Sequence, residues 1–276
     1  MHHVRACLLA SDEVAPDHFL IQLAAPEVAA SAGPGQWVHV RCSDTWDPLL
    51  RRPLSIADVA DDRQSFFILC RVVGRGTEKL VQKRPGELVD IIGPIGRGFD
   101  LDAARRGSSV ALVAGGYGVA PLHLLLRALR EEGADRVKAD VFIGAETAER
   151  LLFLDRLREL ADEVHPSTVD GSLGHRGLVT EPFAAAVSRH AAAVVFACGP
   201  TAMMAEVARI CATARVAGET HGVPCQVSLE QHMGCGVGVC LGCAVPIRDG
   251  DSVVYKRACS DGPVFPADAV AWEAMV

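Results

Sequence analysis

The stretch "VALVAGGYGVAPLHLLLRAL", residues 110–129, decides the fold of the middle of this chain. Its first five residues are apolar, which is typical of a strand buried on both faces, and a glycine-rich turn then leads into an amphipathic helix. The free N–H groups of such a helix start can hold a pyrophosphate. The motif reads G-x-G-x-A-P over residues 116–121 instead of G-x-G-x-x-G. A tight strand-to-helix turn without a ligand is therefore the alternative.

Further strands and helices alternate after this unit. Residues 138–146 and 192–200 read as buried strands, and residues 150–162 read as an amphipathic helix. Alternating strands and helices predict a doubly wound parallel sheet with helices on both faces. Cys198, Gly199 and Pro200 end the second of these strands, at the edge where ligands of such sheets bind.

Residues 1 to about 100 have a different character. Short β-rich runs separated by Pro, Gly and Asp turns predict an antiparallel barrel or sandwich; they span residues 19–25, 36–42, 66–74 and 87–96. Two motifs in this part could bind phosphate. In "RRPLSI", residues 51–56, an arginine and a serine lie on a proline-fixed backbone after a strand. In "VVGRGTEKL", Gly76 and Thr77 precede a helix predicted over residues 78–83. An ordinary strand end and an ordinary helix cap are the alternatives.

The cysteines are unevenly distributed. The chain has ten, and the last five lie within 35 residues. Four of them follow the spacing C-x4-C-x2-C-x15-C: Cys235, Cys240, Cys243 and Cys259. Structural zinc sites usually use two separated cysteine pairs, whereas three cysteines on one loop and a remote fourth are typical of a plant-type 2Fe–2S site. The interspersed glycines let backbone N–H groups turn toward the sulfurs. We predict a 2Fe–2S cluster, with zinc as the alternative, and Cys225 outside the ligand set.

Composition limits the remaining possibilities. A chain of 276 residues is long enough for two domains or for one large domain and a small module, and 50% hydrophobic content gives it a core. A net charge of −7 without a basic run argues against nucleic acid and anionic membranes as partners. We expect no signal peptide, no membrane span, no disulfide framework and a cytoplasmic location.

The order of these motifs resembles one family. R-P-x-S, G-x-G-T before a helix, G-x-G-x-A-P and C-G-P follow one another as in the ferredoxin–NADP reductase-like flavoproteins. Within that group, "SLEQHMGCGVGVCLGC" and "CSDGPVF" resemble the electron-transfer subunit of the NAD-dependent, heterotetrameric dihydroorotate dehydrogenase. The resemblance covers essentially the whole chain. It implies three parts: an FAD-binding β-barrel domain of residues 1–102, an NAD-binding α/β domain of residues 103–220 and a 2Fe–2S module of residues 221–276.

The resemblance also implies roles for individual residues. It places FAD against Arg52, Pro53, Leu54, Ser55, Leu69, Cys70, Arg71, Gly76 and Thr77. It places NAD against Gly116, Gly118, Ala120, Pro121, Gly199 and Pro200. Cys198 is implied as the catalytic residue beside the hydride path. Cys70 stands where a tyrosine is expected in many relatives, which puts one ring contact in doubt.

The implied function is electron transfer between NAD and a partner flavoprotein subunit that oxidises dihydroorotate in pyrimidine biosynthesis. Because nicotinamide transfers two electrons together and an iron–sulfur cluster accepts one, a flavin between them must handle both. Two alternatives stay open at this stage. One is a homologous NAD(P)H-linked reductase subunit serving a hydrogenase, a sulfide-linked enzyme or a glutamate synthase-like oxidoreductase. The other is a zinc module on a degenerate nucleotide fold.

Overall fold

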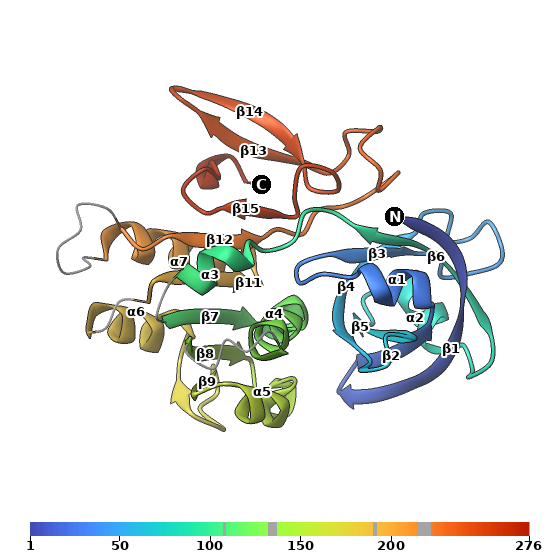
Figure 1. Ribbon diagram of the computed structural model, residues 1–276, viewed down its shortest axis with the longest axis horizontal. Helices are drawn as coiled ribbons and strands as arrows, with labels where there is room; N and C mark the ends of the chain where they lie inside the picture. Colours follow the sequence, from blue (N-terminus) through green and yellow to red (C-terminus); the bar gives the residue numbers. More distant parts are fainter. Residues whose placement is uncertain (107–108, 132–136, 190–191, 215–221, 276) are drawn as a thin grey trace.

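The computed structural model describes residues 1–275 except 107–108, 132–136, 190–191 and 215–221. Figure 1 shows a barrel beside a helix-flanked sheet, with a small C-terminal hairpin above the sheet. In the described part of the chain, no helix is long and apolar enough to span a membrane. The fold class predicted from sequence is confirmed.

The barrel is antiparallel and closed, with strand order β1-β2-β5-β4-β3-β6. Its strands are β1 His2–Ala15, β2 His18–Ala24, β3 Trp37–Val40, β4 Arg52–Val59, β5 Ser65–Arg71 and β6 Leu88–Ile95. Helix α1 Pro26–Ser31 follows β2, and helix α2 Arg75–Val81 follows β5. The four predicted strand runs correspond to β2, β3, β5 and β6, whereas the long strand β1 was not predicted. Because β1 alternates irregularly between apolar and polar residues, its sequence gives a weak strand signal.

The second sheet has the order β10-β9-β8-β7-β11-β12-β15, and only β15 runs antiparallel to its neighbour. Its strands are β7 Ser109–Gly115, β8 Lys138–Ala145, β9 Glu163–Thr168, β10 His175–Arg176, β11 Val194–Cys198, β12 Cys225–Ser228 and β15 Val264–Pro266. Helices α4 Val119–Glu131 and α5 Leu154–Leu160 pack in the core on one face, and α6 Thr180–Arg189 and α7 Thr201–Thr213 pack in the core on the other. Helix α3 Leu101–Arg106 connects the barrel to this sheet.

The C-terminal part is joined to the nucleotide sheet. β12 and β15 complete that sheet, and only the hairpin of β13 Ala244–Asp249 and β14 Ser252–Arg257 forms a sheet of its own. The predicted boundary after residue 102 falls within helix α3. The predicted boundary after residue 220 lies outside the described residues. The cysteine loop between β12 and β13 is therefore anchored at its N-terminal end by the parallel sheet.

Three local predictions need correction. The motif at residues 51–56 does not follow a strand, because β4 begins at Arg52. Helix α2 begins at Arg75 instead of residue 78, so Gly76 and Thr77 lie in its first turn. Helix α5 begins at Leu154 instead of residue 150, because Phe153 adopts a left-handed conformation with φ of 60°.

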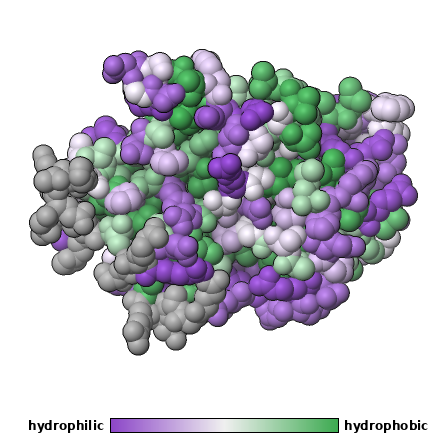
Figure 2. All heavy atoms as spheres, turned by 45° about the horizontal axis from the view of Figure 1, so that its top comes forward, coloured by the Kyte–Doolittle hydropathy of each residue, from purple (hydrophilic) through white to green (hydrophobic). Residues whose placement is uncertain are grey.

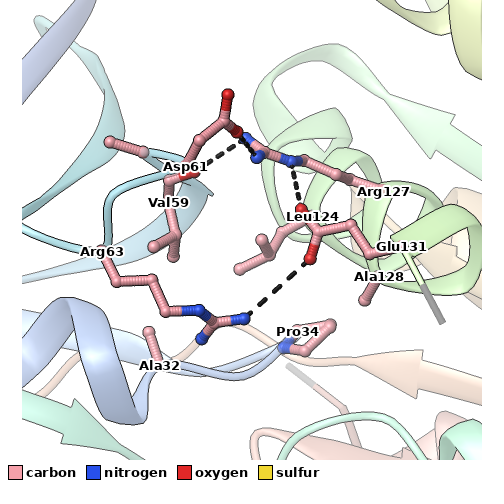
Figure 3. A pocket seen from close by; sticks show the side chains of 10 residues that line it. Ala32, Pro34, Val59, Asp61, Arg63, Leu124, Arg127, Ala128 and Glu131 are labelled. Carbon is pink, nitrogen blue, oxygen red and sulfur yellow. Dashed lines mark hydrogen bonds and ion pairs between the residues drawn. The ribbon is translucent and has the colours of Figure 1, made fainter.

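Arg127 of helix α4 ties the nucleotide domain to the barrel. Its Nη1 donates to Asp58 Oδ1 and to the Val59 carbonyl, each at 2.7 Å, and its Nε donates to Glu131 Oε1 at 2.7 Å. Its Nη2 also pairs with Asp61. Figure 3 shows the guanidinium lying across the hollow between the barrel turn and the helix. One side chain on α4 therefore binds the end of strand β4 and the turn that follows it.

A second link lies one turn earlier in α4. The ring Nδ1 of His123 lies 3.0 Å from the carbonyl oxygen of Ala57 in β4 and donates to it. Burial lowers the pKa of His123 and keeps the ring neutral, although the hydrogen bond to Ala57 opposes that shift. Helix α4 thus holds β4 at two successive turns.

We predict that replacing Arg127 with methionine lowers the free energy of unfolding by about 1–3 kcal/mol, because it leaves the buried acceptors on Asp58 and Val59 without their donor. Urea denaturation followed by circular dichroism measures the change. Arg158→Met is the control, since in the described part of the chain Arg158 pairs with the exposed Asp155, and it should change stability by less than about 0.5 kcal/mol. Equal effects of the two substitutions would contradict the interdomain role of Arg127.

Candidate functional site

The two glycine motifs of the nucleotide domain meet at the carboxyl ends of β7 and β11. These strands are parallel neighbours, with Ala114 beside Cys198. A Cβ on Gly118 would lie 2.4 Å from the carbonyl oxygen of Cys198, so only glycine permits this approach. Gly116 has φ of +54° and open space where a Cβ would lie. The turn thus combines a packed glycine with an open one at the sheet edge where nucleotides bind.

The other predicted nucleotide residues surround this turn. Ala120 and Pro121 are buried in the first turn of α4. Pro200 is the residue before helix α7, and Gly199 lies against the backbone of Gly115. The structure therefore brings both motifs together, although they are separated by about 80 residues in the sequence.

Cys198 is buried at the end of β11, and burial raises the pKa of its thiol far above the usual range. The thiol is therefore neutral at physiological pH. Next to it, the hydroxyl of Tyr117 donates to Glu230 Oε2 at 3.0 Å. The carboxylate of Glu230, together with burial, raises the pKa of Tyr117 to about 12. This pair links the nucleotide turn to the segment that leads into the cysteine loop, and it was not predicted from sequence because its members lie 113 residues apart.

The predicted flavin strand β4 presents a half-buried edge. Arg52, Pro53, Leu54 and Ser55 are all partly accessible, whereas the rest of the strand to Val59 is buried. Leu54 packs against the barrel core. Pro53 and Ser55 lie directly opposite His39 and Trp37 of β3 in the sheet. The outer face of the barrel therefore carries Pro53 and Ser55 of β4 together with His39 and Trp37 of β3.

The neighbouring strand β5 divides its predicted residues between two environments. Leu69 packs in the core shared with the nucleotide domain, and Arg71 is exposed. The side chain of Cys70 lies inside the barrel core, where burial raises its pKa to about 12. Its thiol therefore cannot line the outer face, and only its backbone is available there. A flavin contact at this position would therefore involve the Cys70 backbone, in line with the doubt that the missing tyrosine raises about a ring contact.

The start of helix α2 carries the features expected of a phosphate site. A Cβ on Gly76 would lie 2.9 Å from Nε and Nη2 of Arg52, so glycine lets the guanidinium lie against the helix start. The hydroxyl of Thr77 donates to the Gly74 carbonyl and accepts from the Val73 N–H, each at 3.0 Å. The arginine and the first-turn N–H groups suit an anionic pyrophosphate.

The four cysteines of the predicted cluster form two pairs. The N–H of Cys235 donates to Cys240 Sγ and the N–H of Cys240 donates to Cys235 Sγ, both at 3.4 Å. In the second pair, the N–H of Cys259 lies 3.5 Å from Cys243 Sγ. The first pair is accessible and the second is buried. Among the residues that the structure describes, no three His, Cys, Asp or Glu side chains lie close enough to hold one metal ion. Two pairs suit two irons better than one zinc.

Backbone N–H groups surround these sulfurs. Val237 and Val239 donate to Cys235 Sγ at 3.4 and 3.3 Å, and Gly238 donates to Cys259 Sγ at 3.1 Å. Burial opposes ionisation of Cys235, but the N–H donors outweigh it and lower the pKa of that thiol to about 6. Burial and the neighbouring Cys243 instead raise the pKa of Cys259 to about 11. The loop therefore stabilises negative charge at Cys235 but not at Cys259.

Two buried polar side chains against this loop make no well-formed hydrogen bond with the residues that the structure describes: His39 through both ring nitrogens and Ser260 through Oγ. Ser260 lies against Gly238, and His39 lies against Gly236. Buried donors are normally paired, so their grouping here fits a bound acceptor such as an iron–sulfur cluster. Cys225, by contrast, lies beside Cys211 in the core.

Comparison with known proteins agrees with this geometry. Residues 230–271 match the family model described as the iron–sulfur cluster binding domain of dihydroorotate dehydrogenase B, and residues 112–209 match the oxidoreductase NAD-binding domain. A protein of Desulforamulus reducens named dihydroorotate dehydrogenase B (NAD(+)), electron transfer subunit, is 44% identical over 97% of this chain and 98% of its own length. The chain belongs to this family of electron transfer subunits. A protein of the same name from Shouchella clausii is 37% identical over 96% of the chain and 97% of its own length.

Solved structures extend the comparison to the fold. The structure of the NADH-dependent reduced ferredoxin–NADP oxidoreductase, described in work on flavin-based electron bifurcation, matches with a TM-score of 0.82. It is 31% identical and covers 98% of this chain and 91% of its own. A ferredoxin–NADP⁺ reductase from Neisseria gonorrhoeae with bound FAD and NADP has a TM-score of 0.67 at 15% identity, covering 83% of this chain and 98% of its own. The latter shows a shared fold. Membership of the electron transfer subunit family, the two matching family models and the 31% identical structure support FAD, NAD and a 2Fe–2S cluster as cofactors.

We predict that Cys235 reacts as a thiolate when iron is removed from the chain. Because its pKa lies near 6, its alkylation rate should reach half of its maximum near pH 6 and stay constant above about pH 7. Mass spectrometry of peptides labelled with iodoacetamide between pH 5 and 9 measures this profile. Cys70, buried in the barrel, is the internal control and should stay unlabelled. A midpoint for Cys235 near pH 9 would show that the N–H groups do not stabilise its charge.

Proposed function

We propose that this chain passes electrons between a partner dihydroorotate dehydrogenase subunit and NAD, through a 2Fe–2S cluster and FAD, and so serves pyrimidine biosynthesis. The observation that carries the proposal is the contact of the cysteine loop with the outer face of the barrel, where Gly236 lies against His39 beside the flavin strand. A cluster in this loop would lie next to the flavin, and the flavin would lie next to the nucleotide turn. Membership of the electron transfer subunit family supports the same reading.

Cys235 and Cys240 are proposed to hold one iron, and Cys243 and Cys259 the other. The cluster supplies one-electron transfer, and the flavin exchanges single electrons with it and a hydride with the nicotinamide. The N–H groups of residues 237–240 stabilise the charge on sulfur, and Arg257 fixes the loop by donating to the Gly238 carbonyl at 3.0 Å. The first pair, in which Cys240 is exposed and Cys235 is half-buried, is the half of the site that an external electron partner can approach.

The flavin is proposed to lie along the outer face of β4. Pro53, Leu54 and Ser55 would follow its ring system, with Leu69 and Arg71 of β5 beside it and Cys70 contributing only backbone. Arg52, Gly76 and Thr77 would hold the pyrophosphate. Support comes from the accessible edge of β4 and from the guanidinium of Arg52 at the start of α2.

NAD is proposed to bind across the carboxyl ends of β7 and β11. Gly116, Gly118, Ala120 and Pro121 would receive its phosphates, and Gly199 and Pro200 would border the nicotinamide. Cys198 would lie beside the hydride path as a neutral thiol, a state that its burial maintains. Its part would be to shape the nicotinamide pocket, because a neutral buried thiol is a poor nucleophile.

The partner is proposed to be the catalytic flavoprotein subunit, with two copies of each chain in a heterotetramer. The cysteine loop exposes Val237, Val239 and Leu241, with 43%, 78% and 65% of their surfaces accessible. In Figure 2 the top of the molecule as seen in Figure 1 is turned toward the viewer. Hydrophobic residues lie there among hydrophilic ones. Apolar side chains beside a cluster suit a protein partner that must come close to it. None of the ten cysteines, all of which the structure describes, is in a disulfide bond, and this agrees with the proposed location in the cytoplasm.

A second candidate has a specific observation in its favour. The structural match to the NADH-dependent reduced ferredoxin–NADP oxidoreductase covers nearly the whole chain at 31% identity. The same architecture therefore also occurs outside dihydroorotate dehydrogenases. Under this alternative the chain would be the reductase subunit of another oxidoreductase, with the same cofactors and a different partner.

We predict that serine at Cys235, Cys240, Cys243 or Cys259 abolishes the electron paramagnetic resonance signal of the dithionite-reduced protein, because serine is a poor iron ligand in such sites. Cys225→Ser is the matched control, since Cys225 lies beside Cys211 and not in the loop, and it should retain the signal. Flavin content should stay unchanged in all five variants. Loss of the signal in Cys225→Ser alone would overturn the ligand assignment.

We also predict that Val239→Asp weakens binding of the catalytic subunit from the same genome by about tenfold or more, because a charge would be desolvated in an apolar contact. Isothermal titration calorimetry with the reconstituted protein measures the affinity. Val253→Asp is the control, as Val253 is an exposed valine on the β13–β14 hairpin, away from the cysteine loop, and it should bind normally. If Val239→Asp binds as tightly as the unchanged protein, the loop does not face the partner.

A further inference from the structure

His39 occupies the contact between the barrel and the cysteine loop. It lies on the outer face of β3, directly opposite Pro53 of the flavin strand, and only 1% of its surface is accessible. Its ring meets that of Trp37 edge to face, with centroids 5.5 Å apart. The adjacent residues Val38 and Val40 point into the barrel core. The imidazole therefore projects away from the barrel, toward the C-terminal part of the chain.

Gly236 is the loop residue that receives this ring. A Cβ on Gly236 would lie 2.5 Å from His39 Nδ1 and 2.9 Å from Cε1, and the glycine has φ of +70°. Both the space and the backbone conformation therefore require glycine. The close approach places the Nδ1 edge of the ring next to Cys235, the first cysteine of the loop.

In the described part of the chain, both ring nitrogens of His39 are buried and neither makes a well-formed hydrogen bond. Burial lowers the pKa of His39 to about 4 and keeps the ring neutral, although the nearby backbones of Arg51 and Cys235 oppose that shift. A neutral imidazole carries one N–H donor and one acceptor nitrogen, and a poorly paired buried donor is costly. An acceptor bound beside the cysteine loop would therefore give this N–H a better partner than the backbone does.

We propose that His39 is a positioning residue for electron transfer, whose Nδ1–H donates a hydrogen bond to the redox group bound by the cysteine loop while its ring holds Gly236 against the barrel. The proposal rests on the proposed cluster. The acceptor class is a sulfur of an iron–sulfur cluster, because the Nδ1 edge faces the cysteine loop. A hydrogen bond to sulfur stabilises the more negative, reduced state and raises the reduction potential.

The test is a redox titration of the whole chain carrying FAD and the cluster, followed by electron paramagnetic resonance for the cluster and by absorbance for the flavin. His39→Phe keeps a ring and removes both nitrogens, so the cluster potential should become more negative while the flavin potential stays unchanged. His39→Gln keeps a donor and should restore part of the shift. His232→Phe changes an exposed histidine three residues before Cys235 and should change neither potential.

A second measurement needs no substitution. In protein labelled with nitrogen-15 histidine, electron–nuclear double resonance of the reduced cluster should show one coupled histidine nitrogen, which disappears in His39→Phe. An unchanged cluster potential in His39→Phe together with no nitrogen coupling would overturn the proposal. A shift confined to the flavin potential would overturn it as well, since the hydrogen bond would then go to the flavin. If the unchanged protein carries no cluster signal at all, the proposed function fails before this inference is tested.

Discussion

Helix α4 is the element on which the arrangement of the site depends. Its first turn is part of the proposed nucleotide site, and its later turns hold strand β4 through His123 and Arg127. The distance between the nucleotide turn and the flavin strand is therefore set by one rigid element and not by a flexible linker. Hydride transfer requires the reacting atoms to be held about 3–3.5 Å apart and correctly oriented. A helix fixed to both sides of the crevice provides such rigidity.

The cysteine loop is held against the same barrel from the other side. β12 leads into it from the parallel sheet, Arg257 holds the Gly238 carbonyl, and Gly236 rests on His39. Strands β3 and β4 thus have the nucleotide helix near one end and the cysteine loop on their outer face. The buried pair Cys243 and Cys259 lies toward the protein, whereas Cys240 is exposed. With one exposed side and one buried side, the cysteine loop suits electron transfer from a bound partner subunit toward the interior of this chain.

Much of this organisation could be predicted from the sequence, because its signals are local. The βα unit at residues 110–129, the four barrel runs and the cysteine spacing each lie within a short window. The contacts between elements could not be predicted in the same way. Tyr117 and Glu230 are far apart in the sequence, and the Arg127 network joins helix α4 to a turn more than 60 residues earlier. The inward orientation of the Cys70 side chain follows from strand alternation and could not be seen in the motif alone.

Helix boundaries were the other weak point. Apolar spacing extends through Leu151 and Leu152, which are buried, although the α-helix begins only at Leu154. Apolar spacing indicates which residues are buried, and not where a helix begins. Buried residues in the turn before a helix therefore extend the apolar pattern beyond the helix itself. The sequence also did not predict that β12 and β15 join the nucleotide sheet, because strand order depends on pairing between segments that are far apart in the chain.

The central claim is that electrons from dihydroorotate reach NAD through this chain when the catalytic subunit is bound. Stopped-flow absorbance of the reconstituted complex, mixed with dihydroorotate and NAD⁺, tests it most directly. The account predicts NADH formation by the complex and none by either subunit alone, with the cluster Cys→Ser variants abolishing it in the complex. A complex that oxidises dihydroorotate without forming NADH, or that forms NADH at full rate without the cluster, would contradict the account.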